Sequence, residues 1–552
     1  MSKLALINGD IWIMDEPGNT CEAILIKDGL IVKTGKTDEI LASVDQSNQP
    51  LDNLIQGNDP KNNTVRVIDL CGKTVLPGFI DTHLHFESFA LAMLQVDLKY
   101  PLIKDIEDIK GALRREENID GRWIVGNLYD HNKLTEKSHP TKWDLDQVSL
   151  DQPILIFHIS GHMVSVNSKA LEIAGIDDDT PDPSGGRIER MPEGEATGVL
   201  FETAFNLVIG HIPPYTREEK ASALDKAMEI LLEKGITSVH DMGVEDYTID
   251  LELYQEMFEQ KRLKTRISML YPYASPEKAA SDLVDCSSAF NRQLALNNDY
   301  IKLSGLKCFS DGSMVGRTAA VKKPYRDGTG NGMMLLNEDQ LKKMAGLAKE
   351  KNLQLGIHAI GDQAIEKCLD AYEAVLKDDA PNNRFRIEHC GIGSTEAFDR
   401  MQKMTILVAS QPQFLRDFGD GILLNYHEEV IPWIYAYRRM LDQGLHLSFS
   451  SDAPVTDPDP LLTIRCAVNR KTEAGRPFCP EENISLYEAV KCYTVEGAYA
   501  SFEEDKKGML KPGYFADMVI LTERLNLESL CTISVEKTIL AGEIEFSIGD
   551  GL

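Results

Sequence analysis

The sequence predicts an α/β protein with a (β/α)8 TIM barrel, a small β-sandwich domain built from both termini, and a long insertion after barrel strand 1. Three observations support this fold class. Short β-like segments occupy both ends of the chain, and apolar strands alternate with helical stretches between them. Roughly 150 residues also separate the first two predicted barrel strands. A chain of 552 residues exceeds one compact core, so several structural units are expected.

The two ends of the chain share one pattern, in which Gly, Asp and Asn turn signals separate short apolar segments. Near the N-terminus these segments are Leu4–Asn8, Ile11–Met14, Ala23–Lys27, Leu30–Thr34, Val65–Asp69 and Lys73–Leu76. Near the C-terminus they are Met518–Leu521, Val535–Ile539 and Glu543–Phe546. Two β-rich ends around a different middle predict one small sheet domain, formed by residues 1–70 and 501–552.

The middle of the chain, residues 71–500, is expected to form the barrel, because alternating strands and helices are typical of parallel barrels. Its eight predicted strands are Val75–His85, Thr237–Asp241, Thr265–Tyr271, Ile301–Phe309, Leu353–His358, Phe385–His389, Ile406–Ser410 and Leu445–Ser451. Apolar residues at helical spacing predict helices between them, such as Glu218–Lys234, Glu338–Lys351 and Gln363–Leu376. The segment of about residues 87–230 is too long for a βα loop. It is therefore expected to be an insertion with its own elements, including Arg122–Leu128 and Pro153–His158.

Composition limits the partners that the protein can have. The chain carries 58 Lys and Arg against 87 Asp and Glu, a formal net charge of -29. This charge disfavours nucleic acid and anionic membranes, because phosphate groups bind to clustered Lys and Arg. The ten cysteines form no C-x-x-C pair, the start MSKLALINGDIW lacks the signal-peptide pattern, and no long apolar run occurs. We therefore expect a cytoplasmic protein that acts on a small molecule.

Four histidines and one aspartate fall at or just after the predicted C-terminal ends of barrel strands, the face on which such barrels build active sites. His83 and His85 end the first strand in LPGFIDTHLHF, and alternate residues of a strand point the same way. His358 lies in LQLGIHAIGD, His389 in FRIEHC and Asp452 in LSFSSDAPV. A single histidine at a strand end is commonly structural, but the five residues together predict a site for a divalent metal.

These motifs, in this order and spacing, resemble the amidohydrolase superfamily, and more narrowly its amidohydrolase-3 branch, which includes N-substituted formamide deformylases. The resemblance rests on LPGFIDTHLH, IHAIGD, RIEHC and SSDAPV, and it extends to GHMVSVNSKAL, GVLFE, GITSVHDMG, KCFSDGSMVGRTA and GMLKPGYFADMVIL. It covers nearly the whole chain. The resemblance implies an enzyme that hydrolyses the carbon–nitrogen amide bond of an N-acyl or N-formyl amine.

The resemblance also implies a binuclear centre of two divalent ions, with Zn²⁺ as the first choice, bridged by a carboxylated lysine. By this resemblance the first ion would be held by His83, His85 and Asp452, the second by His358 and His389, and the bridge would be Lys307. Lys307 matches the K-x-F-x-D-G-S motif near the C-terminal end of its predicted strand, whereas Lys302 lies at the other end. Two cations would stabilise a carbamate on Lys307. The alternative is an unmodified lysine that pairs with an acid or donates to the substrate.

Roles for the remaining residues follow from the same resemblance. A hydroxide between the two ions would attack the substrate carbonyl, and Asp452 would take its proton and pass it to the leaving amine. His240, in SVHDMG, could donate a hydrogen bond to the tetrahedral oxyanion. His162, in SGHMVSVNS, resembles a substrate-facing position, with an ordinary loop histidine as the alternative. Glu388 is expected either to orient a metal ligand or to belong to the barrel wall.

Other functions remain open at this stage. The same site could hydrolyse an ester, a lactone or a cyclic amide, or deaminate a ring, and a non-catalytic scaffold is a more distant alternative. Deaminases of the superfamily carry H-x-x-E from the strand-five histidine, but this sequence has Gly361 at the glutamate position. Scaffold relatives usually lack metal ligands, and all of them are present here. Homo-oligomers are common in the family, so a homodimer is expected.

Overall fold

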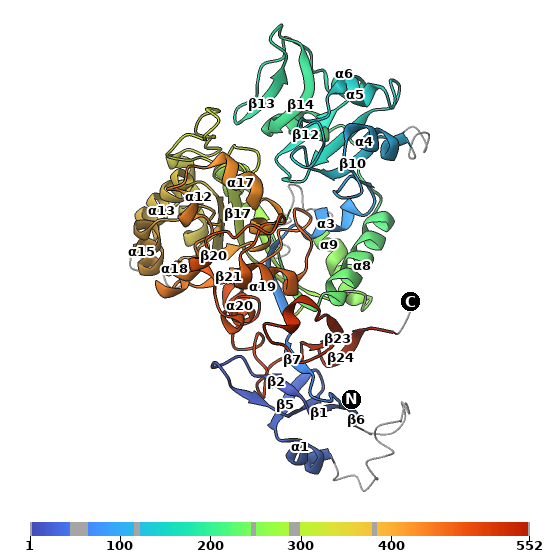
Figure 1. Cartoon of the computed structure of the whole chain (residues 1–552), viewed down its shortest axis with the longest axis vertical. Coiled ribbons are helices and arrows are strands. Elements are labelled where there is room, and N and C mark those ends of the chain that lie inside the picture. Colours follow the sequence, from blue (N-terminus) through green and yellow to red (C-terminus); the bar gives the residue numbers. More distant parts are fainter. Residues whose placement is uncertain are drawn as a thin grey trace.

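Three parts of the molecule lie in a row along its long axis. The computed structural model describes residues 3–44, 65–114, 122–243, 250–285, 298–377 and 383–549. A β domain lies at one end, the barrel lies in the middle, and the insertion lies at the opposite end (Figure 1). This arrangement confirms the predicted fold class.

Both ends of the chain build the β domain. One sheet has the strand order β5-β4-β1-β6, and the other has the order β24-β23-β22-β7-β2-β3. In the second sheet β22 pairs antiparallel with β7, which joins the C-terminal segment to the N-terminal one. The strands are β1 Lys3–Ile7, β2 Asp10–Trp12, β3 Thr20–Cys21, β4 Ala23–Lys27, β5 Leu30–Gly35, β6 Arg66–Asp69, β7 Thr74–Pro77, β22 Met518–Leu521, β23 Val535–Leu540 and β24 Glu543–Ser547.

Eight parallel strands form the barrel. Each pairs in the sheet with the barrel strand that comes before or after it in the chain, in the order β21-β20-β19-β18-β17-β16-β15-β8. The two outer strands are joined by side-chain and loop contacts. Thr82 Oγ1 donates to the carbonyl of Phe449 at 2.9 Å, and the N–H of Asp452 donates to the carbonyl of His83 at 2.8 Å. The strands are β8 Phe79–Leu84, β15 Ile236–Asp241, β16 Arg266–Pro272, β17 Ile301–Phe309, β18 Gln354–Ala359, β19 Arg386–His389, β20 Leu407–Ser410 and β21 Leu447–Phe449.

The predicted first barrel strand, Val75–His85, is two strands in the structure. Strand β7 belongs to the β domain, and β8 begins the barrel after Gly78. A Cβ atom on Gly78 would lie 2.2 Å from Thr237 Oγ1, so only glycine allows the chain to pass this close to the next barrel strand. One continuous apolar stretch therefore contributes a strand to each of two sheets. Its hydrophobic periodicity does not show where the first strand ends and the second begins.

Helices follow the barrel strands and pack around them (Figure 1). The three predicted helices are present as α8 Arg217–Glu233, α12 Glu338–Glu350 and α13 Asp362–Leu376. A capping box of Thr216 and Glu219 begins α8, and its apolar face is buried. The other barrel helices include α9 Asp250–Glu259, α10 Pro276–Val284, α15 Thr395–Met404, α18 Tyr437–Asp442, α19 Pro460–Asn469, α20 Leu486–Cys492 and α21 Val495–Ala500.

The insertion has its own six-stranded sheet, with the order β13-β14-β12-β11-β10-β9. The two predicted segments are present as β10 Ile124–Tyr129 and β11 Ile154–His158, and they pair in parallel. The other strands were not predicted: β9 Val96–Asp97, β12 Met163–Val166, β13 Gly186–Arg190 and β14 Ala196–Glu202. Short helices cover this sheet: α4 Ile106–Leu113, α5 Lys142–Asp146, α6 Ser168–Ala174 and α7 Asn206–Ile209.

A buried ion pair ties the barrel to the C-terminal segment. Arg266, on β16, donates from Nε to Asp517 Oδ2 at 2.6 Å, and both side chains are 4% exposed. We expect Asp517→Asn to lower the free energy of unfolding by about 3 kcal/mol, because it leaves a buried guanidinium without its counter-charge. Asp299→Asn is the control, since its pair with Lys506 is half exposed and worth under about 1 kcal/mol. Urea unfolding followed by circular dichroism measures the difference, and equal effects of the two substitutions would contradict it.

The structure also bears on the expectations about membrane-spanning segments and cysteines. Among the described residues, no helix is both long and apolar enough to cross a membrane. The cysteines in the described ranges are free thiols, and Cys286 lies outside these ranges.

Candidate metal centre

The predicted metal ligands gather at the C-terminal mouth of the barrel. They come from five strands or the loops that follow them: His83 and His85 from β8, Lys307 from β17, His358 from β18, His389 from β19 and Asp452 after β21. The side chains of His83, Lys307, His358, His389 and Asp452 are all buried. Residues far apart in sequence thus meet at one point, as parallel barrel strands require.

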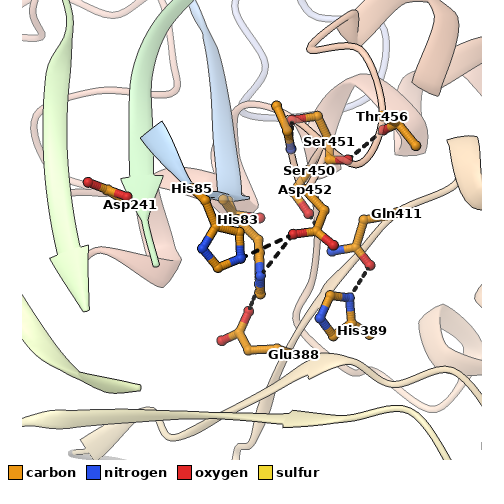
Figure 2. A network of polar contacts seen from close by, with 12 residues as sticks. His83, His85, Asp241, Glu388, His389, Gln411, Ser450, Ser451, Asp452 and Thr456 are labelled. Carbon is orange, nitrogen blue, oxygen red and sulfur yellow. Dashed lines mark hydrogen bonds and ion pairs between the residues drawn. The ribbon is translucent and has the colours of Figure 1, made fainter. Parts of the chain in front are cut away.

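Three of these side chains can contact one ion. His83 Nε2 lies 3.4 Å from Asp452 Oδ1, and His85 Nε2 lies 3.5 Å from the same oxygen (Figure 2). All three candidate ligand atoms lie within 4.8 Å of one another. Neither His83 Nε2 nor Asp452 Oδ1 has a hydrogen-bond partner in the described structure, although both are buried. Buried polar atoms without a partner are costly, and a divalent cation would satisfy both.

Hydrogen bonds on the far side of each ring hold three imidazoles in place. His83 Nδ1 contacts Glu388 Oε2 at 2.6 Å, His85 Nδ1 contacts the carbonyl of Gly243 at 2.8 Å, and His389 Nδ1 contacts Gln411 Oε1 at 2.8 Å. In each case the acceptor holds the proton on Nδ1, so the unprotonated Nε2 has a lone pair that can bind a metal. Glu388 is therefore an orienting residue, and the ring that it orients is His83.

The second group of predicted ligands lies beside the first. The ring of His389 is 4.7 Å from that of His83 and 4.5 Å from that of His358, between ring centres. His358 Nε2 contacts the carbonyl of Gly312 at 3.1 Å, so Nδ1 is the atom left for a metal. Lys307 Nζ is buried and has no hydrogen-bond partner among the described residues. Burial lowers the pKa of Lys307, which favours the neutral amine that carboxylation requires.

A left-handed backbone conformation at His389 and Asp452 directs their side chains toward the candidate metal centre. His389 has φ 68° and Asp452 has φ 59°, both in the left-handed region. Glu388 and His389 are consecutive, so in a regular strand their side chains would face opposite sides. The left-handed turn at His389 allows both to face the centre of the barrel mouth. Such strained positions are commonly kept at functional sites.

His162 approaches the same centre from the insertion. It directly precedes β12, and its ring lies 5.3 Å from the ring of His358, between ring centres. His162 Nδ1 contacts Glu202 Oε2 at 2.9 Å. Burial acts to lower the pKa of His162, but the Glu202 carboxylate outweighs it and raises the pKa above its usual value. The imidazole is therefore suited to donating a hydrogen bond to an oxygen in the pocket.

A narrow, partly open pocket lies beside the candidate ligands. His358, His389, Asp452 and His162 line one part of it together with Ser160 and Ser313. The rest of the wall is apolar and consists of Met314, Val315, Ile360, Phe414, Phe418, Ile422 and Val455, with the ring of Tyr435. The hydroxyl of Tyr435 is buried and has no hydrogen-bond partner in the described structure. Its pKa is raised by burial, so the hydroxyl keeps its proton and is a donor.

His240 lies deeper in the barrel than the candidate ligands. Its Nδ1 accepts from Arg386 Nη1 at 3.1 Å, and Arg386 precedes Glu388 by two residues on β19. His240 is fully buried and does not line the pocket. Its Nε2 is buried and has no hydrogen-bond partner in the described structure, and the predicted contact with a substrate oxyanion stays a prediction. Sequence reasoning missed Tyr435, because nothing in the residues around it marks a site and only the fold brings it beside Asp452.

Comparison with known proteins decides the family. The amidohydrolase family model matches residues 66–546. The chain belongs to the amidohydrolase family. It is 30% identical to YtcJ of Bacillus subtilis, a protein named as an amidohydrolase, over 98% of each chain. It is 28% identical to the N-substituted formamide deformylase of Arthrobacter pascens, over 94% of this chain and 93% of that enzyme.

A solved structure agrees with this assignment. The fold is similar to that of an uncharacterized metal-dependent hydrolase from Pyrococcus horikoshii, with a TM-score of 0.73 and 26% identity over 94% of this chain and 97% of that one. The protein is therefore a metal-dependent hydrolase of the amidohydrolase family, and the predicted enzyme class, hydrolysis of carbon–nitrogen bonds, is confirmed at the level of the family.

Proposed function

We propose that this amidohydrolase-family enzyme cleaves the amide bond of an N-acyl or N-formyl amine whose amine part is apolar. The observation that carries the proposal is the pocket itself. Asp452 and the candidate ligand imidazoles lie at one side of it, and an aromatic and aliphatic wall lies at the other. Such a shape fits a small acyl group at the polar side and an apolar substituent against the wall. The similarity to an N-substituted formamide deformylase supports the same class of substrate.

The donor atoms present fit two divalent ions, with Zn²⁺ as the first choice. His83, His85 and Asp452 would hold one ion, His358 and His389 the other, and a carboxylated Lys307 would bridge them. Imidazole nitrogens and carboxylate oxygens suit such ions. The unpartnered His83 Nε2 and Asp452 Oδ1 lie 3.4 Å apart, and the unpartnered amine of Lys307 interacts electrostatically with the Asp452 carboxylate. When bound, such ions activate water and polarise the substrate carbonyl.

The side chains around the centre provide the proton transfer and the positioning. Asp452 takes the proton of the attacking water and returns it to the nitrogen of the leaving amine. His162 and Tyr435 donate hydrogen bonds to the substrate carbonyl oxygen as negative charge develops on it. Glu202 holds the imidazole of His162 in place through Nδ1, so that Nε2 is free to donate.

Tyr435→Phe tests the role of the tyrosine hydroxyl. We expect kcat to fall about 100-fold, because one donor to the developing oxyanion is lost, while metal content and the folded state stay unchanged. Tyr437→Phe is a matched control, since the hydroxyl of Tyr437 contacts Ser410 Oγ and the residue does not line the pocket. Steady-state kinetics on the same substrate measure both variants. An unchanged kcat in Tyr435→Phe would remove the hydroxyl from the reaction.

Deamination is disfavoured by a steric contact. Gly361 stands where superfamily deaminases carry a glutamate, and a Cβ atom there would lie 1.9 Å from the carbonyl oxygen of Ala320. No side chain fits at this position without movement of the backbone. An ester or lactone substrate would use the same groups and would differ in the leaving atom, which is oxygen. A cyclic amide keeps nitrogen as the leaving atom, but the amine stays attached to the product.

A substrate panel separates these alternatives. N-formyl and N-acetyl derivatives of benzylamine, aniline and a short alkyl amine would be compared with the corresponding esters and with lactones, at equal concentration. We expect the highest kcat/KM for an N-formyl or N-acetyl amine with an apolar amine part, measured by release of the free amine. A preference of tenfold or more for the esters or lactones would overturn the proposed substrate class.

A further inference from the structure

A second cluster of metal-ligating side chains lies in the insertion, outside the barrel. Asp130 and His131 directly follow β10, and His158 is the last residue of β11. The two strands are parallel neighbours, with Tyr129 opposite His158. The three side chains therefore meet at the same edge of the insertion sheet. None of them is among the candidate ligands of the barrel.

We propose that Asp130, His131 and His158 form a separate binding site for a divalent metal ion of the zinc type. His131 Nδ1 lies 3.1 Å from His158 Nε2, and His158 Nε2 lies 3.9 Å from Asp130 Oδ1. The ligand atoms all lie within 4.8 Å of one another. Ligands of a tetrahedral Zn²⁺ at 2.0–2.2 Å from the ion are about 3.3 Å apart, so only small movements would seat an ion between them.

Burial and charge support this site. Asp130 is 5% exposed, His131 8% and His158 1%, so water is largely excluded. The buried carboxylate of Asp130 accepts from the N–H of Asn132 at Oδ1, at 2.9 Å, and the charges of Lys133 and Lys137 offset part of its own. Burial still raises the pKa of Asp130, so a cation beside it would stabilise the carboxylate. Burial lowers the pKa of His131 to about 4, so its imidazole is neutral and able to bind a cation.

Neighbouring groups brace the two rings. His158 Nδ1 lies 2.9 Å from Ser160 Oγ and accepts a hydrogen bond from the N–H of Ser160 at 3.1 Å. Binding of a metal at Nε2 would require the proton to be on Nδ1, where Ser160 Oγ can accept it. The ring of His139 stacks on that of His131 with 4.0 Å between ring centres, and Tyr129 Oη lies 3.0 Å from His139 Nδ1. The alternative is that no metal binds here and that His131 and His158 are joined directly by a hydrogen bond between their rings.

The location gives the ion a structural purpose. Ser160 and His162 follow His158 closely, and both line the pocket beside the candidate barrel ligands. An ion bound to His158 would fix the start of this short segment and hence the position of His162. Loss of the ion would then misplace His162 and weaken its hydrogen bond to the developing oxyanion. The expected signature is a kcat that falls about tenfold with a smaller change in KM, which rests on the proposed role of His162.

Metal analysis tests the site directly and needs no substrate. Protein would be purified without chelator, reconstituted with Zn²⁺, desalted and analysed for zinc per chain. We expect His131→Asn and His158→Asn each to lose about one equivalent relative to the unsubstituted chain. His211→Asn, an exposed histidine of the same insertion, is the control and should lose none. Unchanged zinc in both cluster variants, with normal circular dichroism, would overturn the proposal.

A second background separates this site from the barrel site. In the double variant His83→Asn, His85→Asn the barrel centre is impaired, and adding His131→Asn should remove about one further equivalent of zinc. Co²⁺ in place of Zn²⁺ should give that variant visible absorption bands that disappear with the same substitution. If the double variant retains no metal, the insertion site is wrong, whatever the barrel binds. If the double variant keeps full hydrolytic activity, the proposed mechanism in the barrel is wrong. That result would say nothing against the insertion site, which is tested by the zinc content alone.

Discussion

Asp452→Asn is expected to lower kcat about 1,000-fold on any substrate that the enzyme hydrolyses. The amide oxygen can still act as a metal ligand, but the amide cannot take the proton of the attacking water or return it to the amine. The carboxylate lies within 3.5 Å of both His83 Nε2 and His85 Nε2, so it would lie beside a water bound to an ion at these nitrogens. Elemental analysis of the same preparation shows whether the metals are retained.

The control for this substitution lies in the same loop. Asp457 is exposed and pairs with Lys99, and Asp457→Asn should leave kcat within a factor of two. If Asp452→Asn retains full activity with its metals, another group performs the proton transfer. If it loses the metals as well, Asp452→Glu separates the two roles, because it restores the carboxylate with one extra methylene. Partial recovery of turnover in that variant is expected.

Much of the site could be predicted because its residues lie on regular elements. His83, Lys307, His358 and His389 all belong to strands whose apolar runs end at the mouth of the barrel. In a parallel barrel, all such ends meet on one face, so sequence order alone places them together. The gathering of these candidate metal ligands at one face could therefore be predicted from the strand ends, without any knowledge of distances.

The features that could not be predicted depend on contacts between distant segments. Tyr435 lies in a loop whose backbone is held by Arg470, through an N–H donated from Nη1 to its carbonyl at 2.8 Å. The left-handed backbone at His389 breaks the alternation by which a strand assigns side chains to faces. His240 satisfies the same strand-end pattern as the candidate ligands, but its Nδ1 accepts a hydrogen bond from Arg386 and it does not line the pocket. The strand-end pattern alone does not say which side chains line the pocket.

Lys307→Ala is expected to reduce the zinc bound in the barrel from about two equivalents per chain to one or fewer, apart from the equivalent proposed for the insertion, and to lower kcat at least 1,000-fold. Removing the side chain takes away the group that would bridge both ions, and the remaining histidines hold them less tightly. Lys302→Ala is the matched control on the same strand, because Lys302 Nζ donates to the carbonyl of Ser501 at the opposite end of the barrel. That variant should keep both equivalents and most of its activity.

Chemical rescue distinguishes a carbamate from an unmodified lysine. A short carboxylic acid such as acetate or propionate can enter the space left by the Lys307 side chain and supply a bridging carboxylate. We expect tens of millimolar of such an acid, added with Zn²⁺, to restore part of the metal content and of kcat in Lys307→Ala, and to do nothing for Asp452→Asn. Reconstitution of the unsubstituted apoprotein should likewise depend on bicarbonate. Full zinc content in Lys307→Ala without any added acid would show that Lys307 is no bridge, and its buried amine would then act on the substrate instead.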